Sequence, residues 1–272
     1  MKKIVIVKPG CRELGNELLN HMSIYAYALE TGAHLINHSG FGHTGLRRVL
    51  HALYARIIKR MHRTATLEAW RAPVYLPPTK ALSRKLPGND LYLYGWLFRN
   101  PEGITKYREE LLQEFGPSPA VQKKIQNILL PQQNKTLIGV HLRLTKFTGF
   151  PEGDFLVSAT RVERIVDEYL QENNLDIKNI ALIIISDSKL PEDTFGSYLT
   201  HMSLSASQTN LFLLSKCSVV IGTNTAFANL AAWFGNIPHV VTTNNPLDWV
   251  YYKNRVQYFT NKYATFAFGH DK

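Results

Sequence analysis

The sequence contains no long hydrophobic run. Its first apolar stretch, Ile4–Val7, spans four residues, whereas the hydrophobic region of a signal peptide has about 7 to 15. No other stretch approaches the roughly 18 to 20 apolar residues that a transmembrane helix needs. We therefore predict a soluble, cytoplasmic protein rather than a secreted or membrane-spanning one.

Cysteine is scarce as well. Cys11 and Cys217 are the only two, and neither belongs to a CxxC pair or to a zinc-binding spacing, which fits a reducing compartment. The sequence also lacks a DxD segment for a metal-bound nucleotide sugar, an HExxH motif and a GxSxG motif. His34, His38 and His43 are suggestively spaced, but no carboxylate supports them. We expect no metal site.

The charge of the chain is unbalanced toward the positive. Its 272 residues include 31 Lys and Arg against 21 Asp and Glu, a formal net charge of +10. This balance favours anionic partners, among them nucleotides, nucleic acid and acidic membrane surfaces, without choosing between them. With 45% hydrophobic residues, the chain is long enough for one large folded domain or two modest ones.

Residues 45–71 combine positive charge with helical periodicity. The apolar residues at helical spacing are Leu46, Leu50, Leu53, Ile57 and Met61. The basic residues that fill much of the remaining surface are Arg47, Arg48, Arg56, Lys59, Arg60 and Arg63. The pattern is typical of a helix that lies on an anionic membrane or holds an acidic ligand. A solvated face over an ordinary core stripe is the alternative explanation.

The N-terminal half begins with a βαβ pattern. Buried strands are predicted at 3–7 and 33–37, and between them apolar residues keep helical spacing up to Gly32. Such units build parallel sheets. After an irregular, proline-containing connection, we predict a strand at 90–96 and helices at 104–115 and 119–130.

The C-terminal half repeats the alternation of strands and helices. Apolar runs of four to six residues ended by polar ones are typical of strands buried on both faces of a parallel sheet. Strands are predicted at 136–143, 180–188, 218–222 and 238–243, and helices at 157–173, 208–217 and 226–235. The predicted fold class is therefore α/β.

This organisation predicts two domains, at 1–133 and 134–250, and a tail at 251–272 that packs back on the N-terminal domain. Ligands of open parallel sheets bind outside the carboxyl ends of the strands, so the strand ends are the places to search. Four of them carry polar clusters, at 9–17, 141–146, 186–188 and 222–227.

Two of these clusters lead directly into a helix. The loop that ends with Gly15, Asn16 and Glu17 offers backbone N–H groups and the positive end of a helix dipole, which favour an anion. In the last cluster, Asn224 or Thr225 either caps the following helix or holds a phosphate through N–H and hydroxyl groups. Neither loop has a GxGxxG or a Walker pattern.

The other two clusters carry charged side chains at strand ends. Arg143 can pair bidentately with a phosphate, and His141, on the same side of the pleat, can add a hydrogen bond. A structural salt bridge is the alternative role for this arginine. Asp187 suits a carboxylate that accepts hydrogen bonds from a base such as guanine or from a ribose, and equally one that closes an ordinary turn.

Five segments, taken in order, share the patterns of one known family. ELGNELLNHMSIYAYALETG is similar to a GxLGNQxFxYAxAxxLA opening, and LYGWLFRNPEGITKYREELLQEF to a mid-chain stretch without catalytic meaning. GVHLRLTKF resembles HxRRxDY, IIISDS resembles FSDD, and LLSKCSVVIGTNTAFANLAAWFG resembles LMSxCxxxIxxNSTFSWWxAWL. Together they resemble the fucosyltransferase superfamily, which contains the bacterial α-1,2-fucosyltransferases and, more distantly, the α-1,6- and protein O-fucosyltransferases.

The resemblance implies a GT-B fold, in which two Rossmann-like domains face each other across a cleft. The N-terminal domain would lie on the acceptor side, and the C-terminal domain would bind the nucleotide sugar. The activity implied is metal-independent, inverting transfer of L-fucose from GDP-fucose to a glycan hydroxyl. No cofactor besides this donor substrate would be required.

The resemblance also implies roles for individual residues. Arg143 would neutralise the β-phosphate of the leaving group, because fixed positive charge can replace a metal where negative charge develops. His141 would touch phosphate or ribose, and Asp187 would read guanine. The residues implied in donor binding are Gly15, Asn16, His141, Arg143, Lys146, Asp187, Asn224, Thr225, Ala226 and Phe227, the last four as a turn that holds the diphosphate through backbone N–H groups.

The sequence departs from the family pattern beside the arginine. Leu144 stands where the family has a second arginine, and Lys146 stands where it has an aspartate. Lys146 can supply the missing cation at the pyrophosphate. Inverting transfer usually needs a general base, and Glu13, Glu17 and Asp154 are the nearby acids by motif, with Glu17 and Asp154 as the catalytic candidates.

The predicted function is that of a glycosyltransferase that acts on a surface polysaccharide or a lipid-linked precursor. The helix predicted at 45–71 would then suit docking at the inner membrane. One alternative is a family member that uses another donor or binds nucleotide or glycan without transfer. Another is a basic protein that binds nucleic acid or a membrane surface. Against nucleic acid, the aromatic residues are not interleaved with basic ones as stacking platforms would require.

Overall fold

The computed structural model describes residues 3–8, 13–37, 66–70, 74–76, 90–144, 157–204, 207–223, 225–243 and 264–268, and the single residues Leu53, Ile57 and Met61. The chain divides into two compact units, Met1–Phe115 and Gly116–Lys272. The boundary predicted from the sequence is 133/134. The units divide before helix α6 (Pro119–Leu129), because this helix packs against helix α8 (Gln208–Leu214) of the C-terminal unit.

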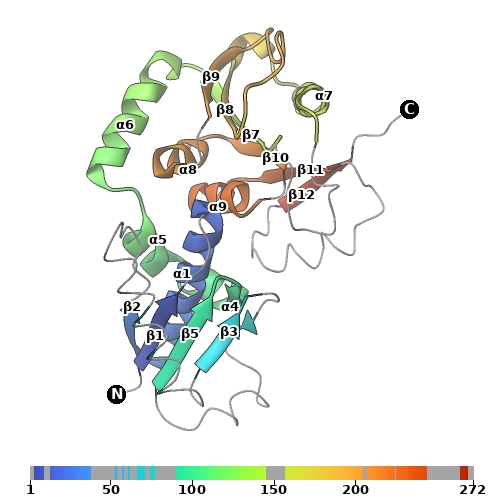
Figure 1. Ribbon diagram of the computed structural model, residues 1–272. Helices are drawn as coiled ribbons and strands as arrows, with labels where there is room; N and C mark the ends of the chain where they lie inside the picture. Colours follow the sequence, from blue (N-terminus) through green and yellow to red (C-terminus); the bar gives the residue numbers. More distant parts are fainter. Residues whose placement is uncertain are drawn as a thin grey trace. The chain divides into compact units, whose positions relative to one another are not determined.

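The N-terminal unit is built on a parallel sheet with the strand order β2-β1-β5-β3 (Figure 1). The strands are β1 (Lys3–Lys8), β2 (His34–Asn37), β3 (Thr66–Ala69) and β5 (Asp90–Gly95). Helix α1 (Leu14–Thr31) connects β1 to its parallel neighbour β2. It ends at Gly32, whose left-handed φ of 61° suits glycine. The βαβ prediction is confirmed.

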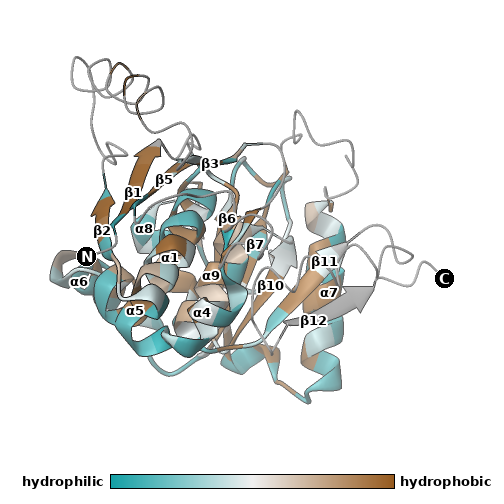
Figure 2. Cartoon of the chain, turned by 90° about the horizontal axis from the view of Figure 1, so that it is seen from below, coloured by the Kyte–Doolittle hydropathy of each residue, from teal (hydrophilic) through white to brown (hydrophobic). Residues whose placement is uncertain are grey.

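Helix α1 covers one face of this sheet. Ile24 and Tyr27 of the helix pack with Ile4 of β1 and Leu93 of β5 in one buried cluster, and Figure 2 shows β1 and β5 in hydrophobic colours. The predicted helix at 104–115 is two helices, α4 (Pro101–Lys106) and α5 (Arg108–Phe115), which both pack on α1. Among the described residues, this unit also contains a two-stranded parallel pair, β4 (Val74–Tyr75) with β6 (Phe98–Arg99).

The predicted helix at 45–71 is wrong at its C-terminal end, because Thr66–Ala69 form strand β3 beside β5. Leu67 and Ala69 are buried while Glu68 is exposed, which is the alternation of a strand with one buried face. A short edge strand of this kind is hidden in a sequence that also fits helical spacing. Leu53, Ile57 and Met61 have helical backbone, and the rest of 38–65 lies outside the described residues.

The C-terminal unit is built on a six-stranded parallel sheet with the order β12-β11-β10-β7-β8-β9. The strands are β7 (Thr136–Leu142), β8 (Ile180–Ser186), β9 (Leu199–Ser203), β10 (Val219–Thr223), β11 (His239–Thr243) and β12 (Ala264–Phe268). The chain starts in the middle at β7, adds β8 and β9 on one side, and then adds β10, β11 and β12 on the other. This is the doubly wound strand order of dinucleotide-binding folds.

Strand β12 falls within the predicted tail at 251–272. We expected this tail to pack on the N-terminal domain. Within this range the structure describes Ala264–Phe268, which pair with β11 in the C-terminal sheet. This part of the tail therefore extends the C-terminal unit.

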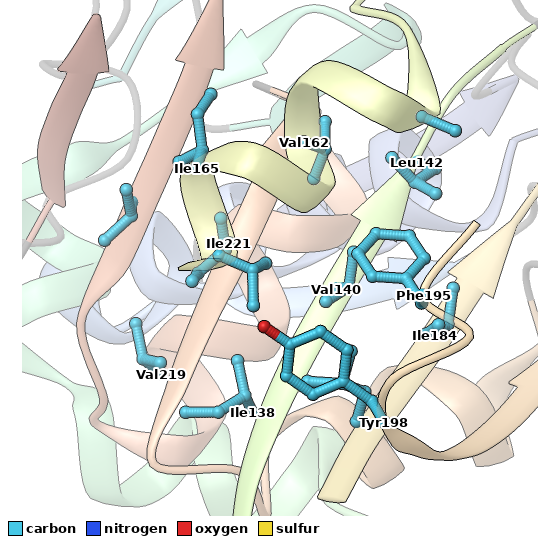
Figure 3. Packing of buried hydrophobic residues seen from close by; sticks show 14 of the residues in the cluster. Ile138, Val140, Leu142, Val162, Ile165, Ile184, Phe195, Tyr198, Val219 and Ile221 are labelled. Carbon is cyan, nitrogen blue, oxygen red and sulfur yellow. The ribbon is translucent and has the colours of Figure 1, made fainter. Parts of the chain in front are cut away.

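The two faces of the C-terminal sheet are covered by different helices. Helix α7 (Ala159–Glu172) buries Val162, Ile165 and neighbouring residues against Val140 and Ile221 of the strands (Figure 3). Residues of opposite parity on β7 point to the other face, where a Cβ on Gly139 would lie 3.0 Å from Leu214 of α8. Helix α9 (Ala226–Gly235) packs with α8. The buried-strand prediction is confirmed, since every residue of β8 and β10 is buried.

Candidate functional site

The strand order of the C-terminal sheet marks one place for a ligand. Strand β7 has β8 on one side and β10 on the other. From β7 the chain adds β8 and β9 on the first side, and it then returns to add β10, β11 and β12 on the second. Connections that diverge in this way leave a crevice at the carboxyl ends of the two central strands. His141 and Arg143 lie at the end of β7, and Thr223 and Thr225 lie at the end of β10 and the start of α9.

Arg143 is held at this edge of the sheet by its neighbours. Its backbone N–H donates to the Thr223 hydroxyl (3.4 Å), and its side-chain Nε lies 3.8 Å from Oδ2 of Asp187. The other carboxylate oxygen of Asp187 accepts a 2.7 Å hydrogen bond from the Leu144 N–H. Arg143 therefore forms the structural salt bridge that was its alternative role in the sequence analysis. Because the arginine and aspartate side chains are 24% and 30% exposed, the ion pair orients a guanidinium that solvent and solutes still reach.

His141 is buried beneath this ion pair. Its ring stacks on the ring of Phe227, with centroids 5.3 Å apart, and its Nδ1 lies 3.4 Å from the Thr225 hydroxyl. Burial, the largest cause, together with the charge of Arg143 lowers the pKa of His141 to about 4, although Asp187 acts in the opposite direction. The imidazole is therefore neutral near pH 7 and serves as a hydrogen-bonding group rather than a charge.

The first turn of α9 faces the same strand ends. Thr225 is its N-cap, with extended φ and ψ of −124° and 156°, and its hydroxyl accepts from the Ala228 N–H (3.1 Å). The N–H groups of Ala226 and Phe227 have no partner inside the helix, because the first N–H groups of any helix lack one. Together with the helix dipole they favour an anion at this position. Capping and anion binding, which the sequence left as alternatives, are compatible here.

Gly222 permits β10 to approach β7 at the site. Its φ is 154°, a conformation that L side chains rarely adopt. A Cβ at this position would lie 2.0 Å from the carbonyl oxygen of His141, which is far inside van der Waals contact. A glycine is therefore required where the two central strands bring the site residues together.

The remaining described candidates lie in the N-terminal unit. Gly15, Asn16 and Glu17 form the first turn of α1, whose N-cap Glu13 makes no side-chain capping bond. Burial raises the pKa of the Glu17 carboxyl, which brings it closer to the range of a general base or acid at neutral pH. Its backbone carbonyl lies 2.8 Å from Nδ1 of His21.

Some of the predicted site residues lie outside the residues that the structure describes, and some residues found at the site were not predicted from the sequence. Lys146, Asp154 and Asn224 lie outside the described residues. Sequence reasoning missed Thr223, Asn229 and His239. The signal for Asn229 was available, because it is the only polar residue within α9. His239 is one histidine in an apolar strand, a pattern that also fits an ordinary core residue.

Neither a membrane span nor a metal centre is found in the part of the chain that the structure describes. Within those ranges, no helix is both long and apolar enough to cross a bilayer. Likewise, no three His, Cys, Asp or Glu side chains among the described residues converge as metal ligands. Cys217 is a buried free thiol, and burial raises its pKa well above the usual range.

Comparison with known proteins places the fold. No protein-family model and no curated protein matches the sequence. Among solved structures, the NodZ α-1,6-fucosyltransferase soaked with GDP-fucose superposes with a TM-score of 0.54 at 13% identity, covering 91% of this chain and 96% of that chain. The fucosyltransferase NodZ from Bradyrhizobium gives a TM-score of 0.52 at 13% identity over 89% and 96% of the two chains. The fold is GT-B, as predicted.

Proposed function

We propose that this protein is a glycosyltransferase that uses GDP-fucose as donor and a glycan hydroxyl as acceptor. The observation that carries the proposal is the convergence of Arg143, His141 and the first turn of α9 at the point where the central strands of the C-terminal sheet diverge. This constellation has the features of a diphosphate site without requiring a metal. It is supported by a fold shared with NodZ, whose structure was determined after soaking with GDP-fucose.

The reaction separates a sugar from a diphosphate. The bond between C1 of the fucose and the β-phosphate oxygen breaks, and C1 bonds to the acceptor oxygen from the opposite face. Arg143 and the N–H groups of Ala226 and Phe227 would stabilise the charge that accumulates on the departing GDP. Lys146, by its position in the sequence, would add a second cation.

The acceptor hydroxyl must lose its proton during transfer. We propose Glu17 as the group that takes it, since burial raises the pKa of this carboxyl toward the range of an efficient base. Asp154 is the second candidate by its position in the sequence. Asp187 would contact the guanine or ribose while it orients Arg143, and Asn16 with Gly15 would contact the sugar–phosphate region.

The experiment is a transfer assay with purified protein in the presence of EDTA. GDP-fucose, GDP-mannose and UDP-galactose are each incubated with a panel of galactose- and N-acetylglucosamine-terminated glycans, and nucleotide release and product mass are measured. We expect fucosylated product from GDP-fucose alone. Turnover of the uridine donor, or strict dependence on added divalent metal, would contradict the proposal. Tight GDP binding without any product would favour a binding protein that has lost transfer.

We also propose contact with an anionic membrane on its cytoplasmic face, where a lipid-linked glycan would be the acceptor. Leu53, Ile57 and Met61 follow one another at four-residue spacing and are 50%, 56% and 70% exposed, although large apolar side chains are ordinarily buried. The basic residues beside them in the sequence are Arg56, Lys59, Arg60 and Arg63. Apolar and basic groups in this combination are typical of helices in the membrane interface.

Vesicle flotation tests this contact. The protein should float with phosphatidylglycerol vesicles and stay behind with phosphatidylcholine vesicles, and the triple variant L53S/I57S/M61S should lose flotation while it keeps GDP affinity. Equal flotation of the triple variant and the wild type would refute the assignment.

A further inference from the structure

Helix α9 contains one polar residue, although the layer in which it is buried is apolar. Its ten residues are otherwise apolar or glycine, yet Asn229 is only 3% exposed in this apolar layer. Burying an amide costs free energy unless its groups are hydrogen-bonded. The contacts of Asn229 therefore indicate what it does.

Asn229 holds the carbonyl of the helix N-cap with two donors. Its backbone N–H lies 3.0 Å from the Thr225 oxygen, as in any helix, and its side-chain Nδ2 lies 2.8 Å from the same oxygen. The Thr225 carbonyl and the Ala226 N–H belong to one planar peptide group and point in opposite directions. Fixing this carbonyl therefore fixes the direction of the Ala226 N–H, which points out of the helix toward the candidate diphosphate site.

Asn229 is in turn oriented by His239, the first residue of β11. Oδ1 of Asn229 lies 3.1 Å from Nδ1 of His239, which is fully buried. Because Nδ2 of Asn229 donates to Thr225, Oδ1 must be the acceptor, so Nδ1 of His239 carries the hydrogen. Burial, the largest cause, together with the nearby His141 lowers the pKa of His239 to about 3, although the backbone of Gly222 acts in the opposite direction. The ring therefore has a single N–H, which points at Asn229.

The contacts form one buried path across the sheet and the helix. It runs from His239 on β11 through Asn229 to Thr225, whose hydroxyl meets His141 on β7. Two apolar side chains would fill the same space without the cost of burying these polar groups, so stability alone does not account for the arrangement.

We propose that Asn229 and His239 are positioning residues that aim the Ala226 N–H at the diphosphate of the donor nucleotide. This inference rests on the proposed function, because it assigns the anion at α9 to that nucleotide. Neither residue touches the ligand. They act through the orientation of one peptide group.

The decisive variant replaces both partners with apolar residues. N229L/H239L leaves no unpaired polar group from the pair, so the fold should be kept, while the Thr225 carbonyl retains only its helical hydrogen bond. We expect a melting temperature near that of the wild type, a loss of GDP affinity of about tenfold by calorimetry, the equivalent of one charge-assisted hydrogen bond, and unchanged affinity for guanosine in a competition assay. A folded double variant that binds GDP as tightly as the wild type would overturn the inference.

A pair of single variants decides the matter if the double variant does not fold. In H239N the amide nitrogen takes the place of Nδ1 and can still donate to Asn229, whereas in H239Q it takes the place of Nε2 and cannot. We expect H239N to bind GDP several-fold more tightly than H239Q, and equal affinities would overturn the inference. H201L on the edge strand β9 is the matched control and should bind as the wild type does. If the wild type itself fails to bind GDP, the proposed function fails instead.

Discussion

Helices α1 and α9 each follow a parallel strand in the chain, yet their first turns have opposite electrostatic character. The turn of α1 carries Glu13 at the N-cap and Glu17 in the first turn. The turn of α9 carries a threonine cap and no acidic residue, and Arg143 ends the neighbouring strand β7. A helix dipole favours negative charge at its N-terminus. In α1 the protein supplies this charge itself, whereas in α9 a ligand would supply it.

This difference suggests a division of chemical roles. The α9 turn is suited to an anion such as a diphosphate, and the α1 turn is suited to a carboxyl group that exchanges a proton. Our sequence-based expectation that both turns favour an external anion treated them as equivalent. The carboxyl groups on α1 make the distinction, and the following variants test it from the largest expected effect to the smallest.

Removing the cation at β7 should have the largest effect. We expect R143A to lower kcat/KM for transfer by about a thousandfold, or ~4 kcal/mol, because a fixed donor to the developing charge is lost. The measurement is steady-state GDP release, with thermal unfolding as the check on the fold. R164A, an exposed arginine on α7, is the matched control. Comparable losses in the two variants would show that net charge, rather than the site, supports activity.

One glycine in each unit can be replaced to compare how closely the neighbouring backbone packs against it. G222A should destabilise the C-terminal unit by ~3 kcal/mol, because its Cβ would meet the His141 carbonyl in a strained conformation. G32A, at the end of α1, has a left-handed φ of 61° but nothing within 4 Å of the added Cβ, so ~1 kcal/mol is expected. Urea unfolding measures both. Similar costs at the two positions would contradict the close approach of β10 to β7.

Neutralising the carboxyl group on α1 should separate the two roles. We expect E17Q to lower kcat by about a hundredfold, as loss of a general base does, while GDP affinity changes by less than about twofold because the anion site lies in the other unit. Stopped assays over a range of pH measure kcat, and calorimetry measures GDP affinity. If E17Q instead weakens GDP binding with little effect on kcat, Glu17 acts on the nucleotide and is not the general base.

Acid should weaken the C-terminal unit in a defined direction. Burial lowers the pKa of His141 to about 4 and that of His239 to about 3, whereas both titrate near 6.5 in an unfolded chain. Between these values the unfolded chain binds protons that the folded chain does not, so stability falls as the pH falls from about 6.5 toward 4.

The expected slope is at most ~1.4 kcal/mol per pH unit for each histidine. Urea unfolding at several pH values measures it, and N229L/H239L should show a shallower slope because one of the two groups is gone. His21 of α1 also has a lowered pKa, so the N-terminal unit contributes to the slope of the wild type as well. Stability that rises on acidification to pH 5 would contradict the burial of these rings.

The fold was largely readable from the sequence because its strands are buried on both faces. Runs such as Ile180–Ser186 are typical of central strands of a covered parallel sheet, and their alternation with amphipathic helices leaves few topologies. The short edge strand Thr66–Ala69 was not found, because four alternating residues beside a helical pattern give no distinct signal. Edge strand β9 was missed as well, since it is largely exposed and partly polar.

Only part of the candidate site could be predicted from the sequence. Strand ends at the centre of a parallel sheet can be found from the sequence, and Arg143 and Thr225 were located in this way. Which groups pair with them depends on strand order and register, which no local pattern encodes. The contact of Arg143 with Asp187 joins the ends of two strands, and the path from His239 to Thr225 joins strand β11 to helix α9.

The central claim is that the carboxyl edge of the C-terminal sheet is a specific site for a guanosine diphosphate. Calorimetric titration with GDP and UDP, at about 0.15 M and about 0.5 M salt, tests it most directly, because binding to a merely basic surface falls steeply with salt. We predict that GDP binds in preference to UDP, that its affinity falls only a few-fold at the higher salt, and that R143A weakens the binding of both nucleotides, because the diphosphate is common to them. Equal binding of GDP and UDP that disappears at the higher salt would contradict the account and identify the protein as a polyanion binder.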